Sequence, residues 1–212
     1  MDFGSRKDEK KDEKSEETYL YNVATPLDIV IKDIKCQLSN NNNKYKTKIN
    51  LIYEKKDENN YDSYEDSNKI FGSKFVENNK DNIKLIINGR ESKLIEKYNL
   101  KKGVNIIQLI ILNKLTNLEG MFDCACTLKN IEELKYLNTK EVNNFSYMFL
   151  GCSSLSDIKP LQNWNVSNGN NFEGMFIKCS SLSDIKPLQN WNVSQFTLEN
   201  IRWYFSYLIR NI

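Results

Sequence analysis

The feature that most constrains this chain is a repeat in its second half. Met-Phe pairs recur every 27 residues, and the 16-residue string CSSLSDIKPLQNWNVS occurs unchanged at Cys152–Ser167 and Cys179–Ser194. A period of about 20–50 residues is typical of arrays in which each unit buries its hydrophobic face against its neighbours. We therefore expect consecutive units to stack, with Met121, Met148 and Met175 in one interior column.

The spacing inside a unit indicates a chain that bends around a core. Apolar residues fall at every third position, as in the series Leu155, Ile158, Leu161 and Trp164. A strand repeats every second residue and a straight helix about every 3.6, so neither accounts for a long run with this period. Pro160 and Pro187 lack an amide donor, which favours a corner. Asn144–Gly151 has the pattern of a short helix, with Asn as its N-cap and Gly at its end. Each unit is thus predicted to hold a short strand, a corner and a helical turn.

The pattern of one unit, Met-Phe-x-x-Cys-x-Ser-Leu followed by Trp-Asn-Val-Ser, resembles the BspA-like leucine-rich-repeat surface proteins, in the variant with Met-Phe in each unit. The resemblance covers Leu115–Ser194, and its first unit departs from the pattern because Ala125 stands where Cys152 and Cys179 stand later. It implies an α+β fold, a short leucine-rich-repeat-like solenoid. It also implies attachment to host or matrix molecules and a location at the cell surface.

The repeat register sets the expected domain boundaries. Extending it backwards places Val104, Ile107 and Ile110 in a partial earlier unit, so the solenoid is expected to span residues 104–194. Residues 1–17 carry many charges and almost no apolar side chains, which predicts a disordered tail. Residues 195–212 have apolar side chains at helical spacing, which predicts a C-terminal capping helix. A truncated or frame-shifted array is the alternative for that end, and the chain would then be a degenerate fragment of a longer array.

Residues 18–103 are predicted to form a β-rich subdomain that covers the N-terminal end of the solenoid. Apolar and polar residues alternate in Val30–Leu38 and again in Tyr45–Tyr53, which indicates a hairpin. A second hairpin is expected where Ile83–Ile87 leads through Asn88-Gly89, a type I′ turn signal, into a returning strand.

Charge and composition narrow the classes of function. The 30 Lys and Arg nearly balance the 28 Asp and Glu, so nothing favours a nucleic-acid partner. The chain has no His, which removes the Ser-His and Cys-His catalytic arrangements. It also shows no secretory h-region and no apolar segment long enough to span a membrane, so the residues alone predict a cytoplasmic protein. We expect no cofactor, metal ion or small-molecule substrate.

The most consistent function is a non-enzymatic module that binds another protein, or a host or matrix molecule as the resemblance implies. Repeat proteins usually bind through an extended outer face. The candidate face holds the polar residues between the apolar positions of the last two units: Ser156, Asp157, Lys159, Gln162, Asn163, Ser183, Asp184, Lys186, Gln189 and Asn190.

A carbohydrate-active enzyme is the alternative. Asp157 and Asp184 would stack about 5 Å apart, which is the carboxylate separation of a retaining glycosidase. Such enzymes place their two carboxyl groups in unequal surroundings, whereas both Asp residues here precede a Lys by two positions. This equivalence favours a solvated charged face.

The thiols and indoles of the repeats are interpreted mainly as core. A disulfide between Cys152 and Cys179 is one alternative. A zinc site formed by Cys124, Cys126, Cys152 and Cys179 is another, although Cys-x-Cys is not the usual zinc spacing. An exposed aromatic ladder of Trp residues that binds sugar or a partner is the alternative to their burial.

Overall fold

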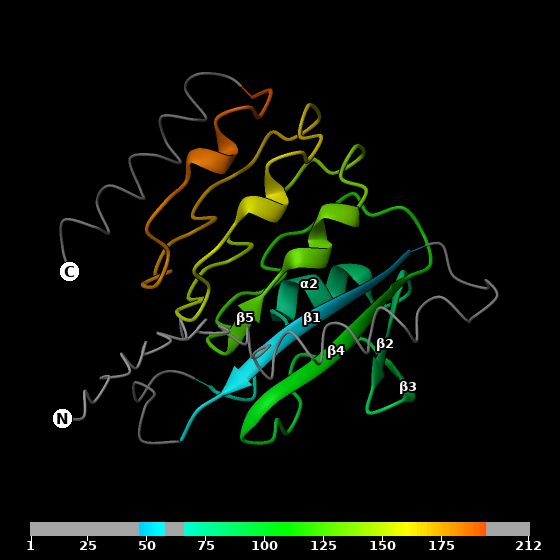
Figure 1. Cartoon of the computed structure of the whole chain (residues 1–212). Coiled ribbons are helices and arrows are strands. Elements are labelled where there is room, and N and C mark those ends of the chain that lie inside the picture. The colour runs from blue at the N-terminus through cyan, green and yellow to red at the C-terminus, as the bar shows by residue number, and fades with distance from the viewer. Residues whose placement is uncertain (1–46, 58–65, 194–212) are drawn as a thin grey trace, which may run out of the picture. The chain divides into compact units, whose positions relative to one another are not determined.

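The apolar segment that follows Lys102 forms the centre of a sheet. In the computed structural model, which describes residues 47–57 and 66–193, this segment is strand β4 (Gly103–Ile111). It lies between β1 (Thr47–Lys55) and β2 (Ile83–Ile87). Strands β3 (Arg90–Lys93) and β5 (Leu128–Asn130) complete an open five-stranded sheet in the order β3-β2-β4-β1-β5, with every pair antiparallel (Figure 1).

The register of this sheet follows from its apolar residues. β1 and β4 pair along their whole length, from Thr47 opposite Ile111 to Lys55 opposite Gly103. In β2, Ile83, Leu85 and Ile87 are buried and alternate with half-buried residues, as expected for a strand with one face toward the core. A shift of one residue would turn these side chains to the other face, so the register is strongly specified.

The predicted hairpin at Asn88-Gly89 is confirmed. β2 and β3 pair through Ile87 and Arg90, and both turn residues have positive φ, 52° for Asn88 and 75° for Gly89, as a type I′ turn requires. The other predicted hairpin is only partly described: Val30–Leu38 lies outside the described residues, and β1 pairs with β4 and β5. The predicted tail at 1–17 and capping helix at 195–212 also lie outside the described residues.

The predicted fold class, a leucine-rich-repeat-like solenoid with a strand, a corner and a helical turn in each unit, is wrong. The fold is organised by the antiparallel sheet, to which the first repeat contributes the short strand β5. The later described repeats have single β-bridges and turns in place of strands. Their only assigned helical segments are the short 3-10 helices η3 (Lys159–Leu161) and η4 (Lys186–Leu188), which correspond to η2 (Glu132–Tyr136) of the first repeat.

Two local corrections explain this difference. The backward extension of the register is wrong because Val104, Ile107 and Ile110 lie on β4, where pairing with β1 and β2 places them in the sheet. The predicted helix at Asn144–Gly151 is a series of turns, because Tyr147 in its middle has a φ of 55°. A residue with left-handed backbone cannot continue a right-handed helix.

The repeats join one another through backbone hydrogen bonds that keep the 27-residue register. The N–H of Phe122 donates to the carbonyl of Met148 at 2.7 Å, and the bond from Phe149 to Met175, at 2.9 Å, repeats it one unit later. Parallel bridges follow the same register through Asn117, Asn144 and Asn171. Left-handed backbone recurs at two positions of each repeat, namely Gly120, Tyr147 and Gly174, and then Cys124, Gly151 and Lys178.

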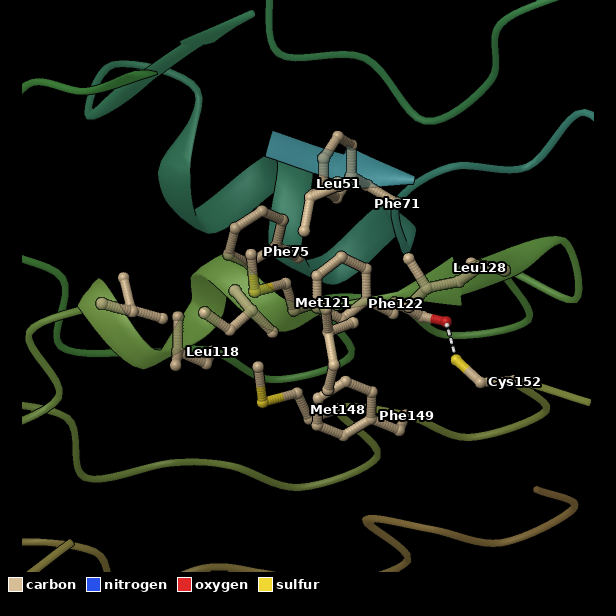
Figure 2. Packing of buried hydrophobic residues seen from close by; sticks show 14 of the residues in the cluster. Leu51, Phe71, Phe75, Leu118, Met121, Phe122, Leu128, Met148, Phe149 and Cys152 are labelled. Carbon is tan, nitrogen blue, oxygen red and sulfur yellow. Dashed lines mark hydrogen bonds between the residues drawn. The ribbon is translucent and has the colours of Figure 1, made fainter. Parts of the chain in front are cut away.

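A column of phenylalanine rings runs through the repeats and into the segment around α2 (Ser73–Asn79). The ring centroids of Phe71 and Phe122 lie 5.8 Å apart, those of Phe122 and Phe149 5.3 Å, and those of Phe149 and Phe176 5.5 Å. Figure 2 shows Phe75 of α2 beside Phe71, with Met121 and Met148 alongside the column. All these side chains are buried, so the column connects the core of the sheet to the core of the repeats.

The α2 segment also satisfies backbone carbonyls of the first repeat. The N–H of Gly72 donates to the carbonyl of Met121 at 3.2 Å. The buried Asn79 side chain donates from Nδ2 to the carbonyl of Asn117 at 3.0 Å. Because an unpaired buried carbonyl is costly, these bonds make the α2 segment a cap for the first repeat.

Replacing Gly72 with Ala should destabilise the protein through this cap. A Cβ at position 72 would collide with the carbonyl oxygen of Gly120, whereas the φ of −77° is ordinary for Ala, so backbone strain adds nothing. We expect a loss of about 1–3 kcal/mol in the free energy of unfolding, measured by urea denaturation. Lys74→Ala, an exposed change two residues away, is the control and should alter stability by less than about 0.5 kcal/mol. Equal stability of the two variants would contradict the close packing of Gly72 on the first repeat.

Candidate functional site

All ten residues of the predicted interaction face are exposed in the structure. They lie on η3, on η4 and in the turns beside them, so equivalent residues of the second and third repeats form two rows. In Figure 1 the yellow and orange 3-10 helices carry these rows side by side, and the green η2 of the first repeat lies next to them. We call this set of ten residues the repeat surface: Ser156, Asp157, Lys159, Gln162, Asn163, Ser183, Asp184, Lys186, Gln189 and Asn190.

The two aspartates of the repeat surface also shape the backbone. Oδ1 of Asp157 accepts a hydrogen bond from the N–H of Lys159 at 2.8 Å, and Asp184 accepts the equivalent bond from Lys186 at 2.8 Å. Asn130 accepts the corresponding bond in the first repeat, at 2.7 Å. These Asx turns start the 3-10 helices and hold the surface residues in a fixed register. The two carboxylates have matching contacts, which do not separate an acid from a base.

The charged side chains of the repeat surface form no ion pairs with other described residues, unlike two charged side chains of the first repeat. Within the described residues, no ion pair joins Asp157, Asp184, Lys159 or Lys186 to another side chain. In the first repeat, by contrast, Lys135 pairs with Glu132. The repeat surface therefore presents charges that the described chain does not neutralise.

Sequence reasoning missed Tyr136 at the edge of the repeat surface. It occupies the position of Asn163 and Asn190 in the first repeat, the residue is 62% exposed, and the ammonium group of Lys135 lies 5.2 Å from its ring centroid. Exposed tyrosines are enriched where proteins bind one another. The sequence feature that could have identified it is an aromatic residue at a repeat position that holds Asn in the two later repeats.

The two tryptophans of the described repeats belong to the core, which confirms the main interpretation and removes the exposed aromatic ladder. Trp164 and Trp191 are 6% and 3% exposed, and their rings stack with centroids 6.4 Å apart. Each indole N–H donates to a backbone carbonyl of the preceding repeat, that of Leu134 or Leu161, at 2.9 Å. A buried Trp needs an acceptor for its indole N–H, and because both indoles have one, their burial stabilises the packing of successive repeats.

The thiols of the second and third repeats are core residues as well. Cys152 and Cys179 are buried free thiols. Sγ of Cys152 donates to the carbonyl of Phe122 at 3.2 Å (Figure 2), and Sγ of Cys179 donates to the carbonyl of Phe149 at 3.0 Å. Burial raises the pKa of Cys179 to about 12 and the pKa of Cys152 well above the ordinary value. Both groups therefore stay protonated near neutral pH and are poor nucleophiles. The described residues contain no group of three or more side chains placed to hold a metal ion.

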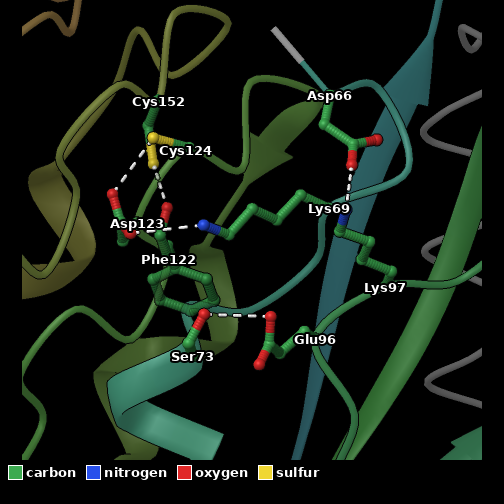
Figure 3. A network of polar contacts seen from close by, with 9 residues as sticks. All are labelled: Asp66, Lys69, Ser73, Glu96, Lys97, Phe122, Asp123, Cys124 and Cys152. Carbon is green, nitrogen blue, oxygen red and sulfur yellow. Dashed lines mark hydrogen bonds and ion pairs between the residues drawn. The ribbon is translucent and has the colours of Figure 1, made fainter.

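Cys124 differs from the other described repeat thiols because it is exposed, and it lies in a polar network that includes none of the ten residues of the repeat surface. Figure 3 shows its Sγ donating to Asp123, which also pairs with Lys69 at 3.2 Å. Partial burial and the Asp123 carboxylate raise the pKa of Cys124. In the same view Lys97 contacts Asp66 at 2.8 Å and holds the pKa of that carboxyl below its usual value. This network ties the chain before α2 to the first repeat.

A cavity of about 100 Å³ lies elsewhere, between the sheet and the first repeat. Neither Asp157 nor Asp184 lines it; its walls are Thr47, Ile111, Asn113, Lys114, Leu115, Leu137, Asn138 and Glu141. The carboxylates that would serve a glycosidase therefore lie outside this cavity. In the part of the chain that the structure describes, no helix has the length and hydrophobicity to cross a membrane.

Comparison with known proteins places more than half of the chain in one family. A family model described as "Mycoplasma protein of unknown function, DUF285" matches residues 93–207, which include β4, β5 and all the described repeats. No curated protein and no solved structure matches the chain.

Proposed function

This chain belongs to the family described as Mycoplasma protein of unknown function, DUF285, and on that premise we propose that it is a non-enzymatic module that docks another protein through the repeat surface. The observation that carries this proposal is the double row of ten exposed polar residues, whose four charged groups have no ion-pair partner among the described residues.

The construction of the repeat surface supports a binding role. The Asx turns at Asp157 and Asp184 fix the backbone beneath the surface, and the buried Trp164 and Trp191 fix it from the other side. A rigid surface loses little conformational entropy when a partner binds, so more of the contact energy remains as affinity. Tyr136 adds an aromatic anchor at one end of the rows.

We further propose that the protein lies at the cell surface. Its support is the resemblance of the Met-Phe units to BspA-like surface proteins, which implies contact with host or matrix molecules. The repeat surface is polar and carries two acidic and two basic side chains, which suits a protein partner. A surface that binds lipid headgroups would instead have clustered basic residues.

Photo-crosslinking tests the docking role directly. With a photoreactive residue at Gln162 or Gln189, the chain should form a discrete crosslinked product in the cells that produce it, because these side chains would lie at the interface. The same residue at Lys80, which is exposed at the end of α2, is the matched control and should give none. Products are measured by gel shift and mass spectrometry. The proposal fails if Gln162, Gln189 and Lys80 give the same pattern.

Labelling of intact cells tests the proposed location. A membrane-impermeant amine reagent should modify Lys159 and Lys186 on intact cells to the same extent as in lysates, since both side chains are exposed. Mass spectrometry of the two peptides gives the labelled fraction, with an abundant cytoplasmic protein as the control. Labelling that appears only after lysis would rule out the surface role and leave a binding module inside the cell.

A further inference from the structure

The charges of the repeat surface form two parallel columns of opposite sign. Asp157 and Asp184 make one column, and Lys159 and Lys186 make the other, two positions along the chain. The 27-residue register stacks the equivalent residues of the two repeats, as the rings of Trp164 and Trp191 beside these residues show with centroids 6.4 Å apart. The repeat surface is therefore neutral overall, with its signs separated across the rows.

Such a pattern is complementary to itself in one orientation. Suppose that two copies face each other and are related by a two-fold axis parallel to the columns and midway between them. This axis places the carboxylates of one copy opposite the ammonium groups of the other. A two-fold axis across the stack would instead place like charges opposite one another. An isologous pair uses one patch on both subunits, so a single surface of this kind is sufficient for a dimer.

We propose that a second copy of this chain is the partner of the repeat surface, bound with the two stacks parallel. This inference rests on the proposed function, because it takes the same surface as the docking site. The pairs formed are Asp157 with the partner's Lys159 and Asp184 with the partner's Lys186, each occurring twice by symmetry.

The neighbouring side chains favour the same arrangement. Gln162, Asn163, Gln189 and Asn190 carry amides, which both donate and accept hydrogen bonds and so can pair with their own kind. On η2 of the first repeat, Lys135 pairs with Glu132 within the chain, so the dimer contact centres on the second and third repeats. Two short rows make a small interface, and the association is accordingly weak and sensitive to salt.

Two variants with precedents in the first repeat test the proposal. D157N/D184N introduces the residue found at Asn130, whose amide oxygen makes the same Asx turn, so the fold is kept while the negative column is lost. K159E/K186E introduces the residue found at Glu132 and makes the whole surface negative. K80E/K140E reverses two exposed lysines outside the repeat surface and is the control for the same change in net charge. Circular dichroism and thermal melting establish that each variant is folded.

Sedimentation velocity at low salt, with protein up to about 0.5 mM, measures the association. The unmodified chain and K80E/K140E should dimerise, whereas K159E/K186E should bind itself about tenfold or more weakly because like charges face each other. An equal mixture of D157N/D184N and K159E/K186E should associate more strongly than either variant alone, since lysines of one then face carboxylates of the other.

Three results would overturn the proposal: an unmodified chain that is monomeric throughout, K159E/K186E dimers as strong as those of the unmodified chain, or a mixture no stronger than its components. The crosslinking at Gln162 separates this failure from failure of the proposed function. A product near twice the 24.9 kDa of the chain supports the self-pairing. A product with a different protein keeps the docking role and rejects the second copy.

Discussion

Backbone hydrogen bonds that join successive repeats, and that recur at equivalent positions, are the interaction on which the rest of the structure depends. They fix the 27-residue register, from Phe122 to Met148 and from Phe149 to Met175, without forming a regular strand. Backbone groups in register oblige side chains to stack as well, so the Phe rings form one column and the buried Trp rings lie nearly parallel, 5° apart. The left-handed residues of each repeat let the chain turn often enough to make these bonds.

The same constraint creates the candidate surface. Once the register is fixed, polar residues at equivalent positions must also align, and the Asx turns at Asp157 and Asp184 add a local restraint at each row. The part of the chain that holds the sheet packs against the first repeat. The α2 segment continues the Phe column through Phe71, and Gly72 and α2 donate hydrogen bonds to backbone carbonyls of the first repeat. The core of the repeats is therefore continuous with the core formed by β1, β2 and β4.

Local sequence features predicted the parts of this structure that local physics determines. The register, the burial of Met121, Met148 and Met175, and the type I′ turn at Asn88-Gly89 all follow from periodicity or turn chemistry. The sheet could not be predicted in this way, because the pairing of β4 with β1 joins residues far apart in the chain. The apolar segment Val104–Leu112 has apolar residues at every third position, as in a repeat, and also at every second position, as in a strand, so its pattern does not decide between them. The turns at 144–151 escaped prediction because tertiary contacts, not propensity, hold Tyr147 at positive φ.

Amide hydrogen exchange, resolved by residue, tests the inter-repeat bonding most directly. The amides of Phe122, Cys124, Phe149 and Gly151 donate to the next repeat, so they should exchange about a thousandfold or more slowly than in an unstructured peptide. They should also open together with the amides of β4, since one core joins the repeats to the sheet. Fast exchange at these four amides in a protein whose β4 amides are protected would contradict the account.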